Sequence, residues 1–211
     1  KSLDELGLIK IVRKIAKSGV DTLAIVFMHS FKNSSHEKLA KKIIEAHVPN
    51  INICLSSIVS PEIGEYERTS TTVANAYVQP IFKSYVSSLV QGLKKIGIIN
   101  DLFLMLSDGG IVHQKTAIEF PIRLVQSGPA GGAQAATLYG KLLKQDNILC
   151  FDMGGTTAKA CLIENGKPNR TTMFEVARVF RFSKGSGLPL QVPVVDMIEI
   201  GAGGGSIARI D

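Results

Sequence analysis

The sequence lacks any apolar stretch long enough to cross a membrane. A transmembrane helix needs about 20 consecutive apolar residues, whereas a long apolar run here covers only residues 23–28. The chain opens Lys-Ser-Leu-Asp-Glu-Leu, without Met and without the basic-then-apolar pattern of a signal peptide. It ends directly after a glycine-rich motif. We therefore expect no membrane partner, and we expect both ends to be cut from a longer chain.

Cysteine is scarce, and its spacing excludes common metal sites. The chain has only Cys54, Cys150 and Cys161, each in an apolar, strand-like run and none in a C-x-x-C pair. This pattern favours buried free thiols in a reducing cytoplasm over metal binding or catalysis. The G-x-S-x-G and H-E-x-x-H motifs are also absent, so serine hydrolase and zinc peptidase activities gain no support.

The charge balance is basic but not clustered. Lysine and arginine total 24 against 18 acidic residues, a net charge of +6. The basic residues are scattered over helix-like segments, as at 37–45, where Lys38, Lys41 and Lys42 lie between Glu37 and Glu45. Such a distribution is typical of a solvated helix face, so we expect no nucleic-acid partner. With 45% hydrophobic and 20% charged residues, the chain is globular.

Local patterns along the chain predict an α/β fold. Residues 2–5 and 34–37 have capping-box spacing and predict helix starts, and the apolar runs at 22–28 and 51–55 predict strands. This strand–helix–strand order predicts a parallel strand pair. The remaining predictions are a loop at 56–65, a helix over 66–96 with Pro80 as its candidate break, a strand at 101–106, and helical residues 121–143 interrupted at 127–132.

A glycine-rich turn follows the apolar strand at 147–151. The turn reads Asp152-Met-Gly-Gly-Thr-Thr157, and the next strand-like run ends at Asn165-Gly166, a strong hairpin signal. Glycine N–H groups and threonine hydroxyls can cradle a phosphate, and a carboxylate beside them can hold Mg²⁺ through water. The turn is neither a Walker A loop nor a dinucleotide fingerprint. The alternative is an ordinary hairpin whose glycines only permit positive φ.

A second unusual segment is the polar start of the long helix. Its residues are poor helix formers, and a local break in sequence logic often marks a functional or strained site. We expect this polar stripe to line a substrate cleft, with polar packing between helices as the alternative. The stripe comprises Arg68, Thr69, Ser70, Thr71, Thr72 and Asn75, of which Arg68, Thr71 and Asn75 are the candidate substrate contacts.

Several blocks of the sequence together resemble the hydantoinase A / oxoprolinase family. They are Ser-Phe-Lys-Asn at 30–33 with His-Glu at 36–37, then the blocks at 60–64, 66–77, 127–132, 152–157 and 200–208. The resemblance implies an α/β, actin-like ATPase (ribonuclease H-like) fold. It places residues 1–126 in the C-terminal part of a first domain and residues 127–211 at the start of a second. The first phosphate hairpin of that fold has no counterpart before residue 152.

The resemblance also implies roles for residues. Asp152 is the expected catalytic contact to Mg²⁺ and phosphate, and the ATP-binding glycines and threonines are Gly154, Gly155, Thr156, Thr157, Gly128, Gly131, Gly132, Gly203 and Gly204. Two alternatives stay open: tight helix packing for the glycines at 127–132 and a simple chain turn for the loop at 201–206. For Lys159 we expect a solvent-facing strand position, with a phosphate contact as the alternative.

The activity that the resemblance implies is ATP-dependent hydrolysis of a cyclic amide, such as a hydantoin or 5-oxoproline. ATP would make the ring carbonyl reactive by phosphorylating its oxygen, and a second subunit or domain of the hydantoinase B type is the expected partner. The segment alone is expected to be inactive. ATP-dependent ketone carboxylases share the motifs and are the first alternative. A non-catalytic nucleotide-binding module and a sugar-type kinase are the others.

Overall fold

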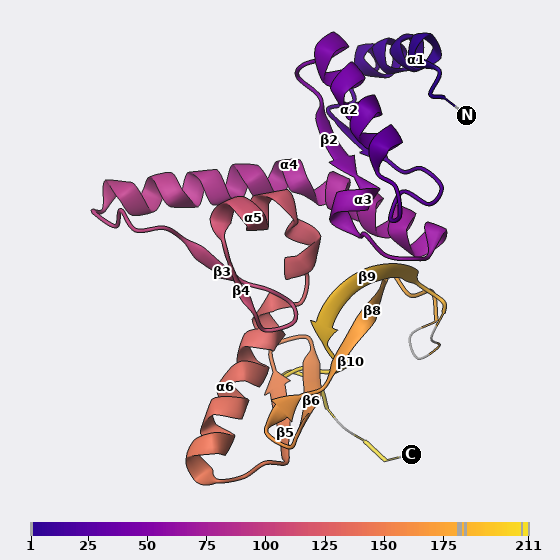
Figure 1. Ribbon diagram of the computed structural model, residues 1–211. Coiled ribbons are helices and arrows are strands. Elements are labelled where there is room, and N and C mark those ends of the chain that lie inside the picture. Colours follow the sequence, from indigo (N-terminus) through magenta and orange to yellow (C-terminus); the bar gives the residue numbers. More distant parts are fainter. Residues whose placement is uncertain (1, 181–182, 184, 208, 211) are drawn as a thin grey trace. The chain divides into compact units, whose positions relative to one another are not determined.

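The computed structural model describes residues 2–180, 183, 185–207 and 209–210, which form a mixed α/β chain (Figure 1). They fall into two compact units. Unit 1 comprises residues 1–100, 118–122 and 174–192, and unit 2 comprises residues 101–117, 123–173 and 193–211. The chain thus passes between the units several times. The single domain boundary after residue 126 stays a prediction.

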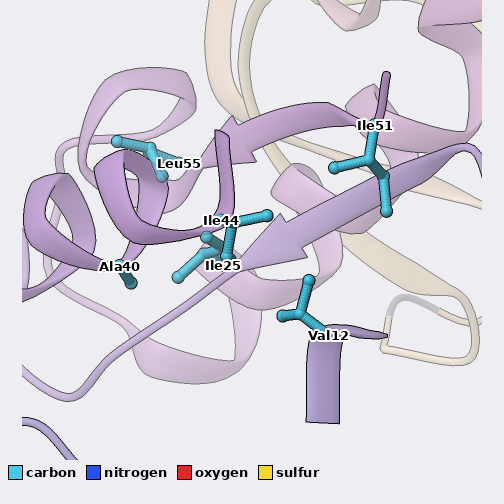
Figure 2. Close-up of a cluster of buried hydrophobic side chains, with 6 residues drawn as sticks. All are labelled: Val12, Ile25, Ala40, Ile44, Ile51 and Leu55. Atoms are coloured by element: carbon cyan, nitrogen blue, oxygen red, sulfur yellow. The ribbon is translucent and has the colours of Figure 1, made fainter. Parts of the chain in front are cut away.

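Unit 1 is built around a parallel pair of strands. Its elements are α1 (Glu5–Lys17), β1 (Thr22–Ile25), α2 (Ser35–His47), β2 (Asn52–Leu55), α3 (Ser56–Val59) and α4 (Glu65–Lys95). β1 and β2 are parallel, with Thr22 opposite Asn52, so the prediction from strand–helix–strand order is confirmed. The buried core between these strands and the first two helices consists of Val12, Ile25, Ala40, Ile44, Ile51 and Leu55 (Figure 2).

The ends of these elements depart from the sequence prediction. The N-cap of α1 is Asp4, whose carboxylate accepts a hydrogen bond from the Gly7 N–H at 2.9 Å, so Ser2 is not the cap. The predicted loop at 56–65 contains α3, and β1 ends before residue 28. α4 continues through Pro80 for 31 residues. A proline removes one backbone hydrogen bond, and the hydrogen bonds of the other helical turns keep α4 continuous.

Glu37 explains why the second capping box does not form. Its side chain is fully buried and accepts hydrogen bonds from Phe27 N (3.0 Å), Ser56 Oγ (2.6 Å) and Ser57 N (2.9 Å). A buried charge is costly unless it is hydrogen-bonded and paired. Consequently Glu37 joins the loop after β1 to α3, and Ser34 at the helix start makes no side-chain cap.

Arg68 of α4 completes this buried network. It is also fully buried, and its guanidinium donates to Ser56 Oγ (3.1 Å) and to the Phe27 carbonyl (2.7 Å). It also forms an ion pair with Glu65 and lies over the Phe31 ring at 5.4 Å. One buried anion and one buried cation, bridged by a serine hydroxyl, therefore hold four segments of unit 1 together.

The network makes the stability of unit 1 dependent on pH. Burial alone would raise the pKa of Glu37, but hydrogen bonds from Ser56, Ser57 and Phe27 lower it below the ordinary value of 4.5. A carboxyl with a lowered folded pKa stabilises the fold above its unfolded pKa, and this stabilisation is lost as the pH falls through the folded pKa. We expect the thermal midpoint to fall between about pH 5 and pH 3. Glu37→Gln should flatten this acid limb in melts followed by circular dichroism. An equally steep acid limb in Glu37→Gln would contradict the assignment.

The remaining elements belong mainly to unit 2. They are β3 (Phe103–Met105), β4 (Ile111–His113), α5 (Gln114–Glu119), η1 (Pro121–Leu124), α6 (Ser127–Leu143), β5 (Ile148–Met153), β6 (Ala158–Glu164), β7 (Lys167–Pro168), β8 (Arg170–Val176), β9 (Leu188–Val195) and β10 (Ile198–Ile200). The main sheet has the order β10-β6-β5, with β7 also on β6, while β3 pairs with β4 and β8 with β9. Helix α6 begins inside the motif at 127–132, which the sequence predicted to interrupt a helix.

The predicted hairpin is confirmed. β5 and β6 are antiparallel, with Asp152 opposite Lys159 and Cys150 opposite Cys161. Asn165 and Gly166, in the next turn, both have the positive φ that this pair favours, 52° and 70°. Helix α6 lies beside β5 and β6 (Figure 1). Because partners across a ladder share a face, and Cys161 and Cys150 pack against Ala130 and Ala133 of α6, these four residues belong to the face of the sheet that packs against α6.

The three thiols are free, as the sequence predicted. Cys54 and Cys161 are buried and Cys150 is half-buried. Burial, together with the neighbouring Cys150, raises the pKa of Cys161 to about 11, so this thiol stays protonated at neutral pH. No helix in the described part of the chain is long and apolar enough to span a bilayer.

Candidate functional site

The β5–β6 turn contains glycines that its own fold does not require. The turn is closed by a hydrogen bond from Gly154 N to the Thr157 carbonyl at 3.0 Å. Neither Gly154 nor Gly155 has a positive φ. A Cβ on Gly155 would meet nothing within 4 Å, and one on Gly154 would meet only the Thr157 carbonyl at 3.9 Å. The simple alternative, glycines needed for positive φ, is therefore wrong.

A second glycine-rich loop, residues 201–206, is seated directly on this turn. Gly204 N donates to the Gly154 carbonyl at 3.0 Å. A Cβ on Gly203 would lie 2.5 Å from Thr156 N and closer still to the Gly155 carbonyl. The loop is closed on itself, because Gly203 N donates to Ser206 Oγ at 2.9 Å. Two motifs that are distant in the sequence thus form one structure, and the loop does more than reverse the chain.

β10 brings the second loop to the turn. It pairs with β6 on the side opposite β5, with Glu199 opposite Lys159 and Ile200 opposite Ala158. The residues after Ile200 therefore leave the sheet beside the first residue of β6, where the β5–β6 turn ends. The strand order therefore places Gly203 against the β5–β6 turn.

The start of α6 contributes a third glycine-rich segment. Its glycines divide into two kinds: a Cβ on Gly131 would lie 3.2 Å from Met105 Sδ, whereas Gly128 and Gly132 would meet nothing within 4 Å. Tight packing therefore accounts for Gly131 alone. Gly128 and Gly132 are exposed and one turn apart. A glycine inside a helix costs about 0.5–1 kcal/mol relative to alanine, and no packing contact within the described residues offsets this.

Charged side chains flank the turn. Asp152 is exposed at the end of β5. Lys159, opposite it, donates from Nζ to Gln126 Oε1 at 3.2 Å and lies 3.6 Å from Glu199 Oε1. Its side chain is only 23% exposed, so the expectation of a solvent-facing position for Lys159 is wrong. Gln126 is the N-cap residue of α6, and its own N–H donates to Ser107 Oγ at 2.9 Å.

These segments have the chemistry of an anion site. Backbone N–H groups at a helix start and in glycine-rich turns attract phosphate oxygens. The β5–β6 turn also carries the hydroxyls of Thr156 and Thr157, which are 3.5 Å apart. The described residues contain no cluster of three or more histidine, cysteine or acidic side chains able to hold a metal. Asp152 as a magnesium contact stays a prediction, and it would act through water, as Mg²⁺ prefers.

The residues expected to line a substrate cleft are fully buried in unit 1. Thr71 Oγ1 donates to the Glu67 carbonyl (2.7 Å) and accepts from Gln191 N (2.8 Å). Asn75 Nδ2 donates to the Glu119 carbonyl at 3.1 Å, and its Oδ1 accepts from Ile122 N at 3.3 Å. With the Arg68 network, these contacts account for the polar stripe by packing, and the cleft role stays a prediction.

Most of the chain matches models of a single protein family. Residues 68–211 match the family model described as hydantoinase/oxoprolinase, and residues 1–48 match that of the hydantoinase/oxoprolinase N-terminal region. The chain is 32% identical to caprolactamase subunit alpha of Pseudomonas jessenii over 99% of its length, covering 29% of that protein. It is 32% identical to the 5-oxoprolinase of Saccharomyces cerevisiae over 98% of its length, covering 15% of that protein.

Acetone carboxylase provides a relative of a different reaction type. The beta subunit from Xanthobacter autotrophicus is 30% identical over 94% of this chain, which covers 27% of that subunit. A nucleotide-free structure from work on ATP-dependent acetone carboxylation superposes with a TM-score of 0.79 at 29% identity, over 99% of this chain and 28% of that one.

The structure of ATP-dependent caprolactamase from Pseudomonas jessenii superposes with a TM-score of 0.82 at 30% identity, over 100% of this chain and 29% of that one. The α/β fold class predicted from the sequence is confirmed by these neighbours. The chain spans less than a third of the length of the relatives it matches.

Proposed function

The chain belongs to the hydantoinase/oxoprolinase family, and from that premise we propose that it helps to bind ATP for the opening of a cyclic amide. Caprolactamase and 5-oxoprolinase are both named after lactam substrates, and the caprolactamase structure is described as ATP-dependent. The activity, its substrate and its partners are proposed for the whole protein of which this segment would form part.

The observation that carries the proposal is the seat of Gly203 against the β5–β6 turn. The seat brings two glycine-rich loops together. A Cβ on Gly155 would project into open space, and one on Gly154 would meet only the Thr157 carbonyl at 3.9 Å. A phosphate group needs such a cradle of backbone N–H groups without obstruction. The residues present therefore fit the phosphates of ATP.

The contribution of these residues would be to position charge. A cyclic amide is a poor electrophile, and bound ATP would supply a phosphoryl group to its carbonyl oxygen. In phosphoryl transfer the protein acts mainly by orientation and electrostatic stabilisation. Thr156, Thr157 and the backbone N–H groups of the turn would orient the phosphates. Asp152 would orient the waters of a bound Mg²⁺.

ATP-dependent ketone carboxylation is the second candidate function, because the acetone carboxylase structure superposes over nearly the whole chain. Several relatives are named as subunits, so we propose a partner subunit of the hydantoinase B type in either case. ADP release by the complete protein with lactams, or with ketones plus bicarbonate, separates the two functions. The free thiols support the proposal of a reducing, cytoplasmic compartment.

Asp152→Ala tests the proposed site. We expect the full-length protein to bind Mg·ATP in calorimetry, and Asp152→Ala to weaken this binding by about tenfold to a hundredfold, because interactions with charged groups contribute about 1.5–3 kcal/mol. The effect should disappear when EDTA removes Mg²⁺. Asp146→Ala, at the other end of β5, is the matched control and should bind normally. Equal Mg·ATP affinity for Asp152→Ala and the unmutated protein would exclude the role of Asp152.

A further inference from the structure

Lys159 is the basic residue closest in sequence to the glycine-rich turn, because no other lysine or arginine occurs between Lys144 and Lys167. It lies on the central strand β6, with Asp152 opposite on β5 and Glu199 opposite on β10. A strand rises about 3.3 Å per residue. Lys159 is therefore roughly 7 Å along the strand from Thr157, within reach of a flexible four-carbon side chain.

The surroundings of the Lys159 ammonium are unusual for a cation. Its hydrogen-bond partner, Gln126, is the N-cap residue of α6. A helix start carries a partial positive charge, which disfavours a cation and favours an anion. The ammonium thus contacts the residue at which α6 begins, and among the described residues Glu199 is its one ion-pair partner.

The contact with Glu199 is easily exchanged. At 3.6 Å between Nζ and Oε1 it is an ion pair without hydrogen-bond geometry, whereas the bond to Gln126 at 3.2 Å has it. An ammonium has three donors. Lys159 can therefore keep Gln126 and turn another N–H towards a new anion. Glu199 is half-exposed, so its carboxylate can be released into water.

We propose that Lys159 binds the terminal phosphate of the nucleotide and that Glu199 is its resting partner, a proposal that rests on the function proposed above. In the resting state Glu199 neutralises the ammonium beside the helix start. When the nucleotide binds, a phosphate oxygen replaces Glu199 while Gln126 holds the side chain in place. Lysine is a compact point charge suited to such a contact, and it would neutralise charge on the transferred group.

The test compares ATP, ADP and AMP binding to the full-length protein by calorimetry. We expect Lys159→Gln to weaken ATP binding about tenfold to a hundredfold and AMP binding by less than about twofold. Lys159→Arg, which keeps the charge, should recover part of the affinity. Glu199→Gln should bind ATP as tightly as the unmutated protein or more tightly, because the competing carboxylate is removed. Lys167→Gln, an exposed lysine on β7, is the matched control, and thermal melts establish that each variant is folded.

The outcomes separate this proposal from the proposed function. Normal ATP binding by a folded Lys159→Gln protein overturns the role of Lys159 while ATP binding itself stands. Equal losses in Lys159→Gln and Glu199→Gln show a strand-pairing role and overturn it as well, as does an equal loss for ATP and AMP. Absence of ATP binding by the folded, unmutated protein overturns the proposed function and this inference together.

Discussion

Arg68→Ala is expected to destabilise unit 1 by about 3–5 kcal/mol, the usual cost of removing one partner from a buried charged pair. The variant leaves the buried Glu37 carboxylate without a nearby buried cation. It also leaves the Phe27 carbonyl and Ser56 Oγ without the guanidinium donors that they have in the native fold. Typical domains have a stability of only about 5–15 kcal/mol, so a loss of this size removes a large part of the margin.

Denaturant unfolding of the full-length protein, followed by circular dichroism, measures this loss. Arg13→Ala, an exposed position on α1 in the same unit, is the matched control and should change the free energy of unfolding by less than about 0.5 kcal/mol. Arg68→Lys keeps the charge but not the planar fork, so it should recover only part of the loss. If Arg68→Ala unfolded like the control but lost substrate turnover, the packing role would be wrong and the cleft prediction would gain support.

Local sequence patterns predicted the elements whose cause is local. The parallel pair in unit 1 follows from two apolar runs separated by an amphipathic helix. The β5–β6 hairpin follows from an apolar strand, a glycine-rich turn and the Asn165-Gly166 pair. In each case the deciding residues are close in sequence, so hydrophobic period and turn chemistry suffice.

The errors involve side chains whose partners are distant in the sequence. Glu37 has the spacing of a capping box, but a buried bond to Ser56 competes with the cap and prevails. The polar stripe of α4 is visible in the sequence as a run of poor helix formers. The reason for it is not visible, because Thr71 meets Gln191 only in the folded chain. A run of poor helix formers inside a helix thus marks a special site. It does not reveal whether the side chains there pack against the protein or bind a ligand.

The candidate site could be predicted from the sequence only in part. Counting back from the turn places Lys159 opposite Asp152, so the sequence contained a signal for a shared face. It contained none for the approach of α6 to that face, which decides that Lys159 meets Gln126 and not solvent. Likewise, the motif at 201–206 was recognisable by resemblance alone. Its contact with the turn depends on β10 pairing with β6, which no local sequence pattern predicts.

Gly203→Ala is expected to abolish the contact between the loop at 201–206 and the β5–β6 turn, and to weaken Mg·ATP binding by about a hundredfold. The added methyl group would meet the Gly155 carbonyl and Thr156 N, which are backbone atoms of a closed turn and cannot move aside like a flexible side chain. Overpacking of this kind costs about 1–3 kcal/mol, and each 1.4 kcal/mol corresponds to a tenfold change in affinity. The strain falls on the donors that would cradle the phosphates.

Gly205→Ala is the matched control for Gly203→Ala, because it lies in the same loop and a Cβ there would meet nothing within 4 Å. Calorimetry should show normal Mg·ATP affinity for Gly205→Ala, and melts should show that both variants fold. Unlike the loss in Asp152→Ala, the loss in Gly203→Ala should persist without Mg²⁺, because the alanine displaces backbone donors and leaves the carboxylate untouched. If a folded Gly203→Ala protein bound Mg·ATP normally, the seat would be a packing contact only, and the observation that carries the proposed function would be lost.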